Sequence, residues 1–199
     1  MRDLPELLIL RHGETEWNRA GRFQGRADSP LTELGRAQAA QQAAILRALG
    51  VGADSHAIFT SPQGRARETA LIICADIGGT AQEDADLVEI AMGEMTGQTR
   101  ADMRSAYPHL LEEQGGLEWY FRVPGGERFE QMQARAEAVL SRLTRPTVLV
   151  THGITSRFLR GAALGLSRQE LLDQPGGQGV VYRVAGGVST LHNTPSDAV

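Results

Sequence analysis

The sequence contains no lysine, and all 20 of its basic residues are arginine. This absence excludes a Walker A lysine for nucleotide phosphates, a Schiff-base lysine for pyridoxal phosphate and a lysine general base. If side-chain cations bind phosphate in this protein, arginine must supply them. Its planar fork of donors suits phosphate oxygens.

Other features are also scarce, and each scarcity removes a class of protein. The single cysteine, Cys74, cannot form an internal disulfide, and its apolar helical setting predicts a buried, inert thiol. No apolar run approaches the roughly 18 to 20 residues of a membrane helix, and the N-terminal sequence lacks the pattern of a secretory signal. The formal net charge of -4 argues against a nucleic-acid partner. We therefore expect a cytoplasmic protein that binds neither membranes nor nucleic acid.

Apolar periodicity predicts alternating strands and helices within a single domain that spans residues 1–199. The predicted strands span residues 5–11, 57–61 and 147–151, with a hairpin over 179–193. The predicted helices span residues 31–50, 128–143 and about 154–165. One more helix is expected to begin with Ser61 as its N-cap and Pro62 in its first turn. The pattern indicates an α/β fold, a three-layer α/β/α sandwich with a mostly parallel central sheet.

Residues 89–126 do not fit this alternation. They combine methionines, Trp119, Tyr120 and a Pro-Gly-Gly turn. A segment this irregular is more often a lid over a cleft than part of a sheet, and we expect that role here. The tail from residue 194 is expected to fray.

Reactive side chains follow the predicted strands at the points where they end. Arg11 and His12 come directly after the first strand, Arg65 lies one turn into the helix after the second, and His152 follows the strand 147–151. Ligands of open α/β sheets bind at the carboxyl ends of the strands. The sequence therefore predicts that two histidines and two arginines lie together at the carboxyl edge of the sheet.

These residues carry a family resemblance. LRHGETEWN resembles the Arg-His-Gly signature of the histidine phosphatase superfamily, the phosphoglycerate-mutase-like group. TSPQGRARETA resembles its Ser-Pro, Arg-Ala and Thr-Ala block, LVEIAMGEMTG its glutamate ahead of two spaced glycines, and VLVTHG its second histidine. The four blocks occur in the family's order between residue 7 and about residue 160, and together they are very specific.

The resemblance implies metal-independent phosphoryl transfer to and from a small phosphorylated metabolite, with no metal and no other cofactor. His12 is the implied nucleophile, since a neutral imidazole can hold the phosphoryl group covalently. Arg11, Arg65 and His152 would supply positive charge to the phosphoryl oxygens. Glu89 is the implied general acid, although sequence alone leaves Glu94 as a rival.

The resemblance also implies a substrate-binding loop after the first strand, in which Thr15 and Asn18 help bind phosphate. Gln24 and Gly25 match the part of the family's loop that lines the substrate pocket, and Arg22 and Arg26 are possible additions. Gly13, next to His12, is interpreted as the residue that lets the backbone approach phosphate closely.

Each of these residues also has a plainer interpretation. A histidine at a strand end can merely satisfy a backbone carbonyl, and Glu89 can be an ordinary surface carboxylate. Arg65 and Arg67 point to different faces of their helix, so only one faces the cleft, and the motif match selects Arg65. The remaining histidines have no supporting neighbours and are expected at the surface or in turns: His56, His109 and His192.

Three functions stay open, and hydrolysis of phosphate monoesters is preferred. A cofactor-primed phosphoglycerate mutase would carry a longer insertion with additional basic and tyrosine residues after the glutamate block, and IAMGEMTGQTR has neither the lysine nor the tyrosine expected there. A non-catalytic module that binds a phosphorylated ligand is disfavoured because His12 and Glu89 are both present. The sequence identifies neither the leaving group nor the oligomeric state, a homodimer included.

Overall fold

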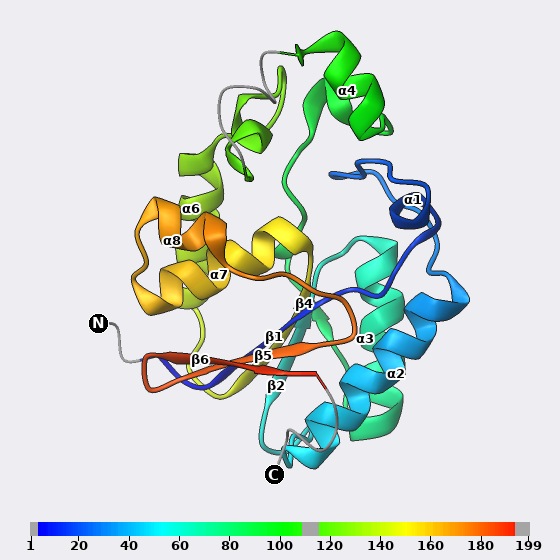
Figure 1. Cartoon of the computed structure of the whole chain (residues 1–199). Coiled ribbons are helices and arrows are strands. Elements are labelled where there is room, and N and C mark those ends of the chain that lie inside the picture. The colour runs from blue at the N-terminus through cyan, green and yellow to red at the C-terminus, as the bar shows by residue number, and fades with distance from the viewer. Residues whose placement is uncertain (1–3, 109–115, 194–199) are drawn as a thin grey trace.

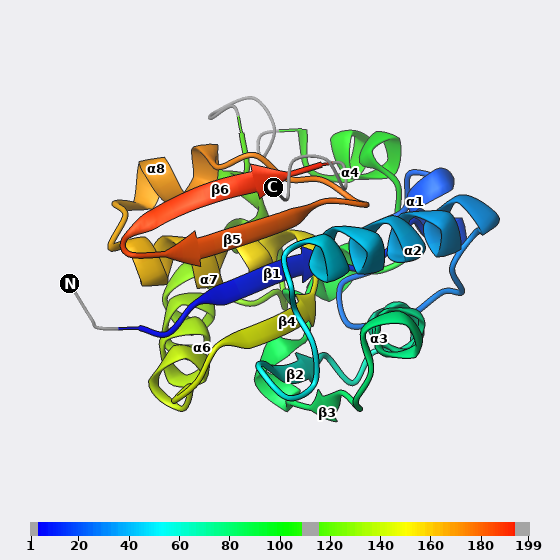
Figure 2. The ribbon, with the colours of Figure 1, turned by 90° about the horizontal axis from the view of Figure 1, so that it is seen from below.

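The computed structural model describes residues 4–108 and 116–193, and its centre is one six-stranded sheet. Figure 2 shows the strands in the spatial order β3-β2-β4-β1-β5-β6. The strands span β1 Leu7–Arg11, β2 Ala57–Thr60, β3 Gln82–Glu83, β4 Thr147–Thr151, β5 Val181–Ala185 and β6 Val188–His192. The first four in this spatial order are parallel to one another, whereas β5 and β6 form an antiparallel hairpin. The hairpin turns at Gly186 and Gly187, both at positive φ, as the sequence predicted.

Helices cover both faces of the sheet, which confirms the predicted three-layer arrangement (Figure 1). On one face lie α2 Glu33–Ala48 and α3 Gly64–Ile77, and on the other lie α6 Phe129–Ser141, α7 Gly153–Leu164 and α8 Arg168–Asp173. The observed bounds of α2, α6 and α7 differ by at most two residues at each end from the predicted helices 31–50, 128–143 and 154–165.

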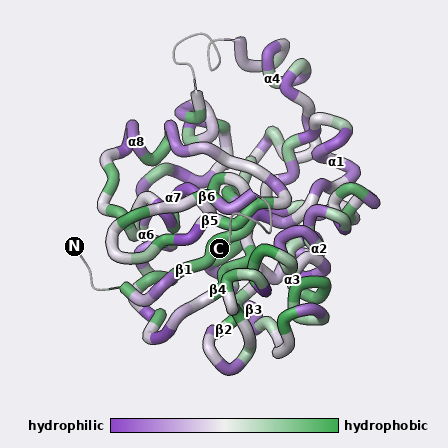
Figure 3. The backbone as a smooth tube through the Cα atoms, turned by 60° about the horizontal axis from the view of Figure 1, so that its bottom comes forward, coloured by the Kyte–Doolittle hydropathy of each residue, from purple (hydrophilic) through white to green (hydrophobic). Residues whose placement is uncertain are grey.

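The strands alternate their side chains between two apolar clusters. Leu7 and Ile9 of β1 pack with α6 and α7, whereas Leu8 and Leu10 pack with α2 and α3. All four side chains are fully buried, and each contributes about 1.5 to 3 kcal/mol to stability. In Figure 3 the tube is hydrophobic through the central strands and mostly hydrophilic at α4. The core therefore holds β1 rigidly up to the point where it delivers Arg11 to the sheet edge.

Short elements surround the carboxyl ends of the strands. They are α1 Glu16–Arg19, η1 Ala85–Leu87, η2 Gly93–Met95, α4 Arg100–Ala106 and η3 Glu118–Arg122. Figure 1 places α4 at the top of the view, beyond the strand ends. Within the described part of 89–126, Trp119 and Phe121 are buried in the cluster that includes α6 and α7. Ile90, Met92, Met95 and Met103 belong to the same cluster, so this segment packs on the core at both ends of its described part.

Two histidines differ from expectation. His56 and His192 are both buried rather than exposed. His56 hydrogen-bonds Ser55 Oγ at 2.8 Å and lies 3.4 Å from a Glu6 carboxylate oxygen, whereas His192 is the inward-facing residue at the end of the edge strand β6. His109 and the tail from residue 194 lie outside the described residues. No helix in the described part of the chain is long and apolar enough to span a membrane.

Candidate active site

The two histidines of the site follow neighbouring parallel strands. β1 and β4 pair in register, with Arg11 opposite Thr151, so His12 and His152 occupy equivalent positions one residue further on. The His12 backbone N–H donates to Thr151 O at 2.9 Å. The two imidazole centroids are 5.1 Å apart, with 61° between the ring planes. The register of two buried strands therefore brings together histidines that are far apart in the sequence.

Hydrogen bonds fix the tautomer of the buried His12 ring. Nδ1 lies 2.7 Å from Gly13 O, which can only accept, so Nδ1 carries the proton. Nε2 accepts from Arg65 Nε at 3.1 Å. Burial, aided by the charges of Arg11 and Arg65, holds the pKa of His12 well below its ordinary value of 6.5. His12 is therefore a neutral imidazole with its lone pair on Nε2.

The Arg65 guanidinium is buried and organises the loop opposite His12. It donates to Gly25 O at 2.9 Å, to Ala27 O at 2.6 Å and to Asp28 Oδ1 at 2.9 Å. Burial lowers the pKa of Arg65, and the hydrogen bond to Asp28 opposes that shift. Arg65 therefore ties the nucleophile candidate and the loop 25–28 into one unit.

Arg65 and Arg67 face opposite ways, as their spacing predicted. The Arg65 side chain is 1% exposed, whereas that of Arg67 is 58% exposed and pairs with Glu83 at 3.1 Å. The helix that carries both residues thus offers one arginine to the cleft and one to solvent.

The predicted start of α3 at Ser61 and Pro62 is wrong by two residues. The N-cap is Gln63, and no side-chain bond of its own caps the helix. Asp28 Oδ1 accepts the Arg65 backbone N–H at 3.3 Å instead. The Ser61 hydroxyl lies 2.8 Å from His152 Nε2. Ser61 therefore serves the site, while a carboxylate from another segment supplies the cap.

Arg11 and His152 each keep a buried nitrogen that has no hydrogen-bond partner among the described residues. These atoms are Arg11 Nε and His152 Nδ1. A buried polar group without a partner is costly, so a phosphate oxygen would satisfy either one. Burial lowers the pKa of Arg11 and, with the charges of Arg65, His12 and Arg11, holds the pKa of His152 well below 6.5. His152 is thus neutral here and can offer a hydrogen bond rather than the positive charge expected from sequence.

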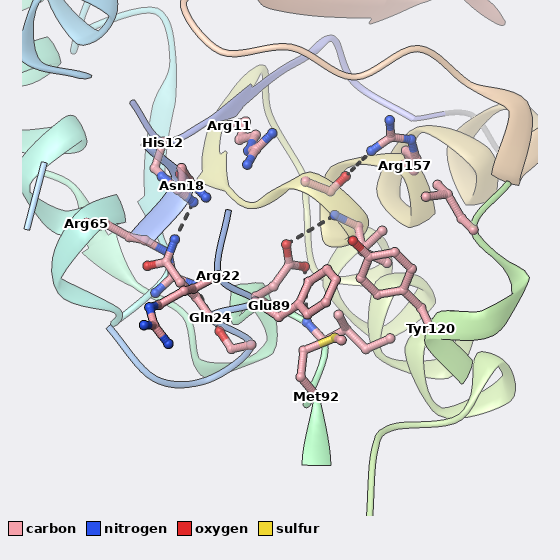
Figure 4. A pocket seen from close by; sticks show the side chains of 16 residues that line it. Arg11, His12, Asn18, Arg22, Gln24, Arg65, Glu89, Met92, Tyr120 and Arg157 are labelled. Atoms are coloured by element: carbon pink, nitrogen blue, oxygen red, sulfur yellow. Dashed lines mark hydrogen bonds between the residues drawn. The ribbon is translucent and has the colours of Figure 1, made fainter. Parts of the chain in front are cut away.

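Glu89 lies against the N-terminus of α7. Its Oε1 accepts from the backbone N–H of Ile90 at 3.0 Å, and from the N–H and hydroxyl of Thr155 at 3.2 Å each. Its Oε2 accepts, among the described residues, only from Ile154 N at 3.2 Å. An N-terminal helix turn favours a carboxylate at this position. Oε2 is the less committed oxygen, and Figure 4 shows the carboxyl group in the middle of the pocket.

Glu94, the rival of Glu89, lies elsewhere. It is exposed, its carboxylate accepts from the Tyr107 hydroxyl, and it does not line the cavity. The geometry therefore favours Glu89 as the carboxyl group of the site.

The loop after β1 forms one wall through a short hydrogen-bond chain. Asn18 Oδ1 accepts from Thr15 N at 3.3 Å and from Gln178 Nε2 at 3.2 Å, which leaves the Asn18 amide N–H groups for the cavity. Thr15 Oγ1 accepts from Gln24 Nε2 at 2.7 Å. Asn18, Gln24 and Gly25 line the cavity, whereas the fully buried Thr15 stands behind them. Thr15 thus supports this wall without contributing to its surface.

The two additional arginines of this loop separate. Arg22 lines the cavity and donates to Gly97 O at 2.7 Å. Arg26 is outside the lining and lies 3.5 Å from Glu127. Only Arg22 is therefore placed to meet a bound ligand.

Most of these groups open into one cavity of about 250 Å³, shown in Figure 4, whereas the fully buried His152 stands behind its surface. Sequence reasoning missed Arg157, which lines it from the start of the second turn of α7 and donates to Gly153 O at 2.9 Å and to Gln174 O at 2.9 Å. Its spacing of four residues from Gly153 on a helix was the available signal. Tyr120 also lines the cavity, and burial raises its pKa, with Glu89 adding to the shift. The rest of the lining includes Phe23, Ile90, Met92, Leu117 and Ile154.

Gly13 has a role in packing that the sequence did not predict. A Cβ on Gly13 would lie 2.1 Å from Gly35 O, and a Cβ on Gly35 would lie 2.0 Å from Glu14 O. The lack of a side chain thus lets the start of α2 pack directly on the backbone beside His12. Close approach between two protein segments requires this glycine, whatever binds in the cavity.

Among the residues that the structure describes, no three His, Cys, Asp or Glu side chains gather as a metal site would require. What does gather is two arginines, two neutral histidines and one carboxyl group at the edge of a parallel sheet. Such a set can bind a tetrahedral anion, attack it with a nitrogen lone pair and exchange a proton.

The fold is the phosphoglycerate-mutase-like α/β/α sandwich. Residues 7–187 match the histidine phosphatase superfamily (branch 1), and the chain belongs to that superfamily. Its members act on small phosphorylated substrates by phosphoryl transfer.

Individual relatives carry both kinds of name found in the superfamily. A protein of Salmonella paratyphi B named probable phosphoglycerate mutase GpmB is 34% identical over 174 residues, which cover 81% of this chain and 75% of that protein. The structure is similar to YhfR of Bacillus stearothermophilus, with a TM-score of 0.79, 32% identity and coverage of 94% and 95% of the two chains. It is also similar to the mycobacterial glucosyl-3-phosphoglycerate phosphatase, with a TM-score of 0.73, 30% identity and coverage of 90% and 89%.

Proposed function

We propose that this protein is a metal-independent phosphatase that hydrolyses small phosphate monoesters through a phosphohistidine on His12. The observation that carries the proposal is the state of that ring. Its proton is committed to Gly13 O, its lowered pKa keeps it neutral, and its Nε2 lone pair lies beside Arg65. A nucleophile needs that lone pair, and a phosphoryl group needs that positive charge.

In the first step the phosphate group of the substrate enters among the unsatisfied donors. Arg11 Nε, His152 Nδ1 and the Asn18 amide would bind its oxygens. His12 Nε2 attacks phosphorus in line, the Nε2–P bond forms and the P–O bond to the leaving group breaks. The negative charge of the bound phosphate group favours a proton on Glu89 Oε2, and Glu89 gives that proton to the leaving oxygen.

In the second step water completes the cycle. Glu89, now a carboxylate, takes a proton from the water that attacks phosphorus, and the P–Nε2 bond breaks. Inorganic phosphate leaves, His12 returns to its neutral form and Glu89 is protonated again. Protons balance over the two steps, and no step needs a cofactor.

The cavity also limits the leaving group. Its volume of about 250 Å³ lies below the roughly 300–1,000 Å³ typical of pockets for larger ligands. The leaving group would face Arg157, Tyr120 and the apolar side chains of the lining, which are Phe23, Ile90, Met92, Leu117 and Ile154. The small volume of this space favours a small metabolite. We further propose that 89–126 acts as a lid within a single domain, because its Ile90, Met92 and Leu117 contribute to this cavity.

A mutase is the second candidate, since the chain is similar to a protein named probable phosphoglycerate mutase. A mutase must keep its phosphohistidine away from water and must be primed by a bisphosphate. Hydrolysis stays preferred because IAMGEMTGQTR, directly after Glu89, has neither the lysine nor the tyrosine expected of a mutase insertion.

Hydrolysis of 4-nitrophenyl phosphate in excess EDTA, followed by a panel of natural monoesters, tests the proposal. We expect turnover by the wild type, loss of at least about a thousandfold in His12→Ala, and near-normal turnover in the control His56→Ala, whose ring lies outside the cavity. No turnover by the wild type on any monoester would overturn the phosphatase proposal. Bisphosphate-dependent transfer between phosphoglycerates would then establish the mutase.

A further inference from the structure

A buried ion pair lies behind the segment that carries Glu89. Glu127 and Arg135 are 8% and 10% exposed, and the Arg135 Nη2 and Nε atoms lie 3.1 Å from the two Glu127 carboxylate oxygens. Glu127 ends the Pro-Gly-Gly turn, and Arg135 lies two helical turns later on α6. Neither residue lines the cavity.

Both residues of this pair form hydrogen bonds with the main chain on either side of Glu89. Arg135 Nη1 donates to Val88 O at 2.7 Å and to Asp86 O at 2.6 Å. Glu127 Oε2 accepts from Ala91 N at 3.2 Å, and the Glu127 backbone N–H donates to Ala91 O at 2.9 Å. The backbone is therefore fixed one residue before Glu89 and two residues after it.

The turn that carries Glu127 fits closely on the same segment. Glu94 N donates to Pro124 O at 3.1 Å, and Met92 forms a β-bridge with Gly126. A Cβ on Gly93 would lie 2.1 Å from Pro124 O, so the two backbones touch. The Pro-Gly-Gly turn thus places the Glu127 carboxylate within hydrogen-bond distance of the segment that carries Glu89.

Stability alone does not explain such a pair. Burying two charges costs several kcal/mol of desolvation, and a well-packed apolar replacement is often as stable. An ion pair whose side chains also make three hydrogen bonds to the backbone instead defines one geometry for the segment that it holds. A displacement of 1 Å at a reacting group can cost on the order of a hundredfold in rate.

We propose that Glu127 and Arg135 are positioning residues that set the place of the Glu89 carboxyl group for proton transfer to the leaving oxygen. The inference rests on the proposed function, in which Glu89 is the general acid. It gives the Pro-Gly-Gly-Glu turn a role in the reaction, although the turn touches neither substrate nor nucleophile.

The test compares two substrates that differ in their need for a proton. Phenolate is a more basic leaving group than 4-nitrophenolate, so phenyl phosphate depends more on a general acid. A general acid contributes roughly 10²- to 10⁴-fold. We expect Glu127→Gln to lower kcat/KM for phenyl phosphate about tenfold more than for 4-nitrophenyl phosphate. The ratio kcat/KM reports the steps up to phosphoryl transfer to His12, so later hydrolysis does not enter.

A double-mutant cycle separates positioning from general damage. Glu127→Gln is introduced into the wild type and into Glu89→Gln, and kcat/KM for phenyl phosphate is measured in all four proteins. We expect a loss of about tenfold in the first background and less than about threefold in the second, because the group to be positioned is gone. Glu137→Gln, on the exposed side of the same helix with Gln133 as its partner, is the matched control.

Arg135→Lys provides a second variant, since it keeps the charge but the three donors of an ammonium cannot make all four hydrogen bonds to the two carbonyls and the two carboxylate oxygens. If Arg135→Lys does not fold, the isosteric Glu127→Gln decides the question. Equal losses for both substrates, or an undiminished loss in the Glu89→Gln background, would overturn the inference while leaving the phosphatase proposal intact. No turnover of either substrate by the wild type would overturn both.

Discussion

Arg65 Nε donates to His12 Nε2 at 3.1 Å, so the arginine occupies the lone pair that the proposed reaction uses. A phosphate oxygen must therefore replace His12 as the acceptor before attack can begin. This exchange couples binding to activation, because the incoming anion takes the donor and releases the nucleophile.

Replacement of Arg65 should cost both activity and stability. In Arg65→Lys the three donors of an ammonium cannot serve Gly25, Ala27, Asp28 and His12 together. We expect kcat/KM to fall at least about a hundredfold and the free energy of unfolding to fall by about 2 to 4 kcal/mol. Urea unfolding and steady-state kinetics measure the two losses, with the exposed Arg67→Lys as the control. A stable, inactive Arg65→Lys would contradict the structural half of this expectation.

Arg11 should behave in the opposite way. Its Nε is buried without a partner among the described residues, and burial lowers the pKa of Arg11. The charge of Arg11 therefore destabilises the folded state. We expect Arg11→Gln to lose at least about a hundredfold in kcat/KM while its thermal midpoint stays the same or rises. Differential scanning calorimetry checks this, and a drop in midpoint as large as that of Arg65→Lys would show that Arg11 is structural.

The two histidines make stability depend on pH in a defined direction. Their pKa values are lowered well below the 6.5 of an ordinary histidine, so below about pH 6.5 the unfolded chain binds more protons than the folded one. The free energy of unfolding should therefore fall as the pH drops through this range, by up to about 1.4 kcal/mol per pH unit for each histidine. Urea titrations at several pH values should show a shallower slope for His152→Gln than for the wild type. Identical slopes would mean that His152 is not held neutral.

The contact between Gly13 and Gly35 predicts a sharp steric effect. In Gly13→Ala the new methyl group would meet the Gly35 carbonyl, and in Gly35→Ala it would meet that of Glu14. We expect each variant to lose about 2 kcal/mol or more of unfolding free energy and to lose activity, because His12 is displaced. Gly52→Ala, where the nearest atom is 3.7 Å away, is the control and should change stability by less than about 1 kcal/mol. Wild-type stability in Gly13→Ala would refute the assigned packing role.

Arg157 should affect substrate binding more than chemistry. It lines the cavity away from His12 and lies outside the set of groups that the proposed reaction uses. We expect Arg157→Gln to raise KM about tenfold with a smaller change in kcat. Arg145→Gln, an exposed arginine that donates to Asp54 O, serves as the control. A fall in kcat at unchanged KM would place Arg157 in the chemical step instead.

The parts of the site that follow from local pattern could be predicted from the sequence. Apolar strands that end in Arg11-His12 and at His152, with alternating helices, suffice to predict a parallel sheet with both histidines at one edge. The two-residue spacing of Arg65 and Arg67 likewise predicts that they face apart. Each of these inferences needs only periodicity and the geometry of parallel strands.

Contacts between distant segments could not be predicted in this way. The start of α3 was misplaced because Asp28 caps it from another loop, which frees Ser61 to bond His152. Thr15 was expected to bind phosphate, but its hydroxyl is taken by Gln24 and it stands behind the wall. Gln178 hydrogen-bonds Asn18, which lies 160 residues earlier in the sequence, and no local sequence pattern predicts this contact.

The most direct test of the account is to trap the phosphorylated protein during turnover. Wild-type protein in EDTA is mixed rapidly with 4-nitrophenyl phosphate, quenched in alkali, which preserves phosphohistidine, and mapped by mass spectrometry. We expect one phosphoryl group on His12, formed and consumed at rates compatible with turnover, and none in His12→Ala. A phosphoryl group on any other residue, or sustained hydrolysis without a phosphorylated His12, would contradict the account.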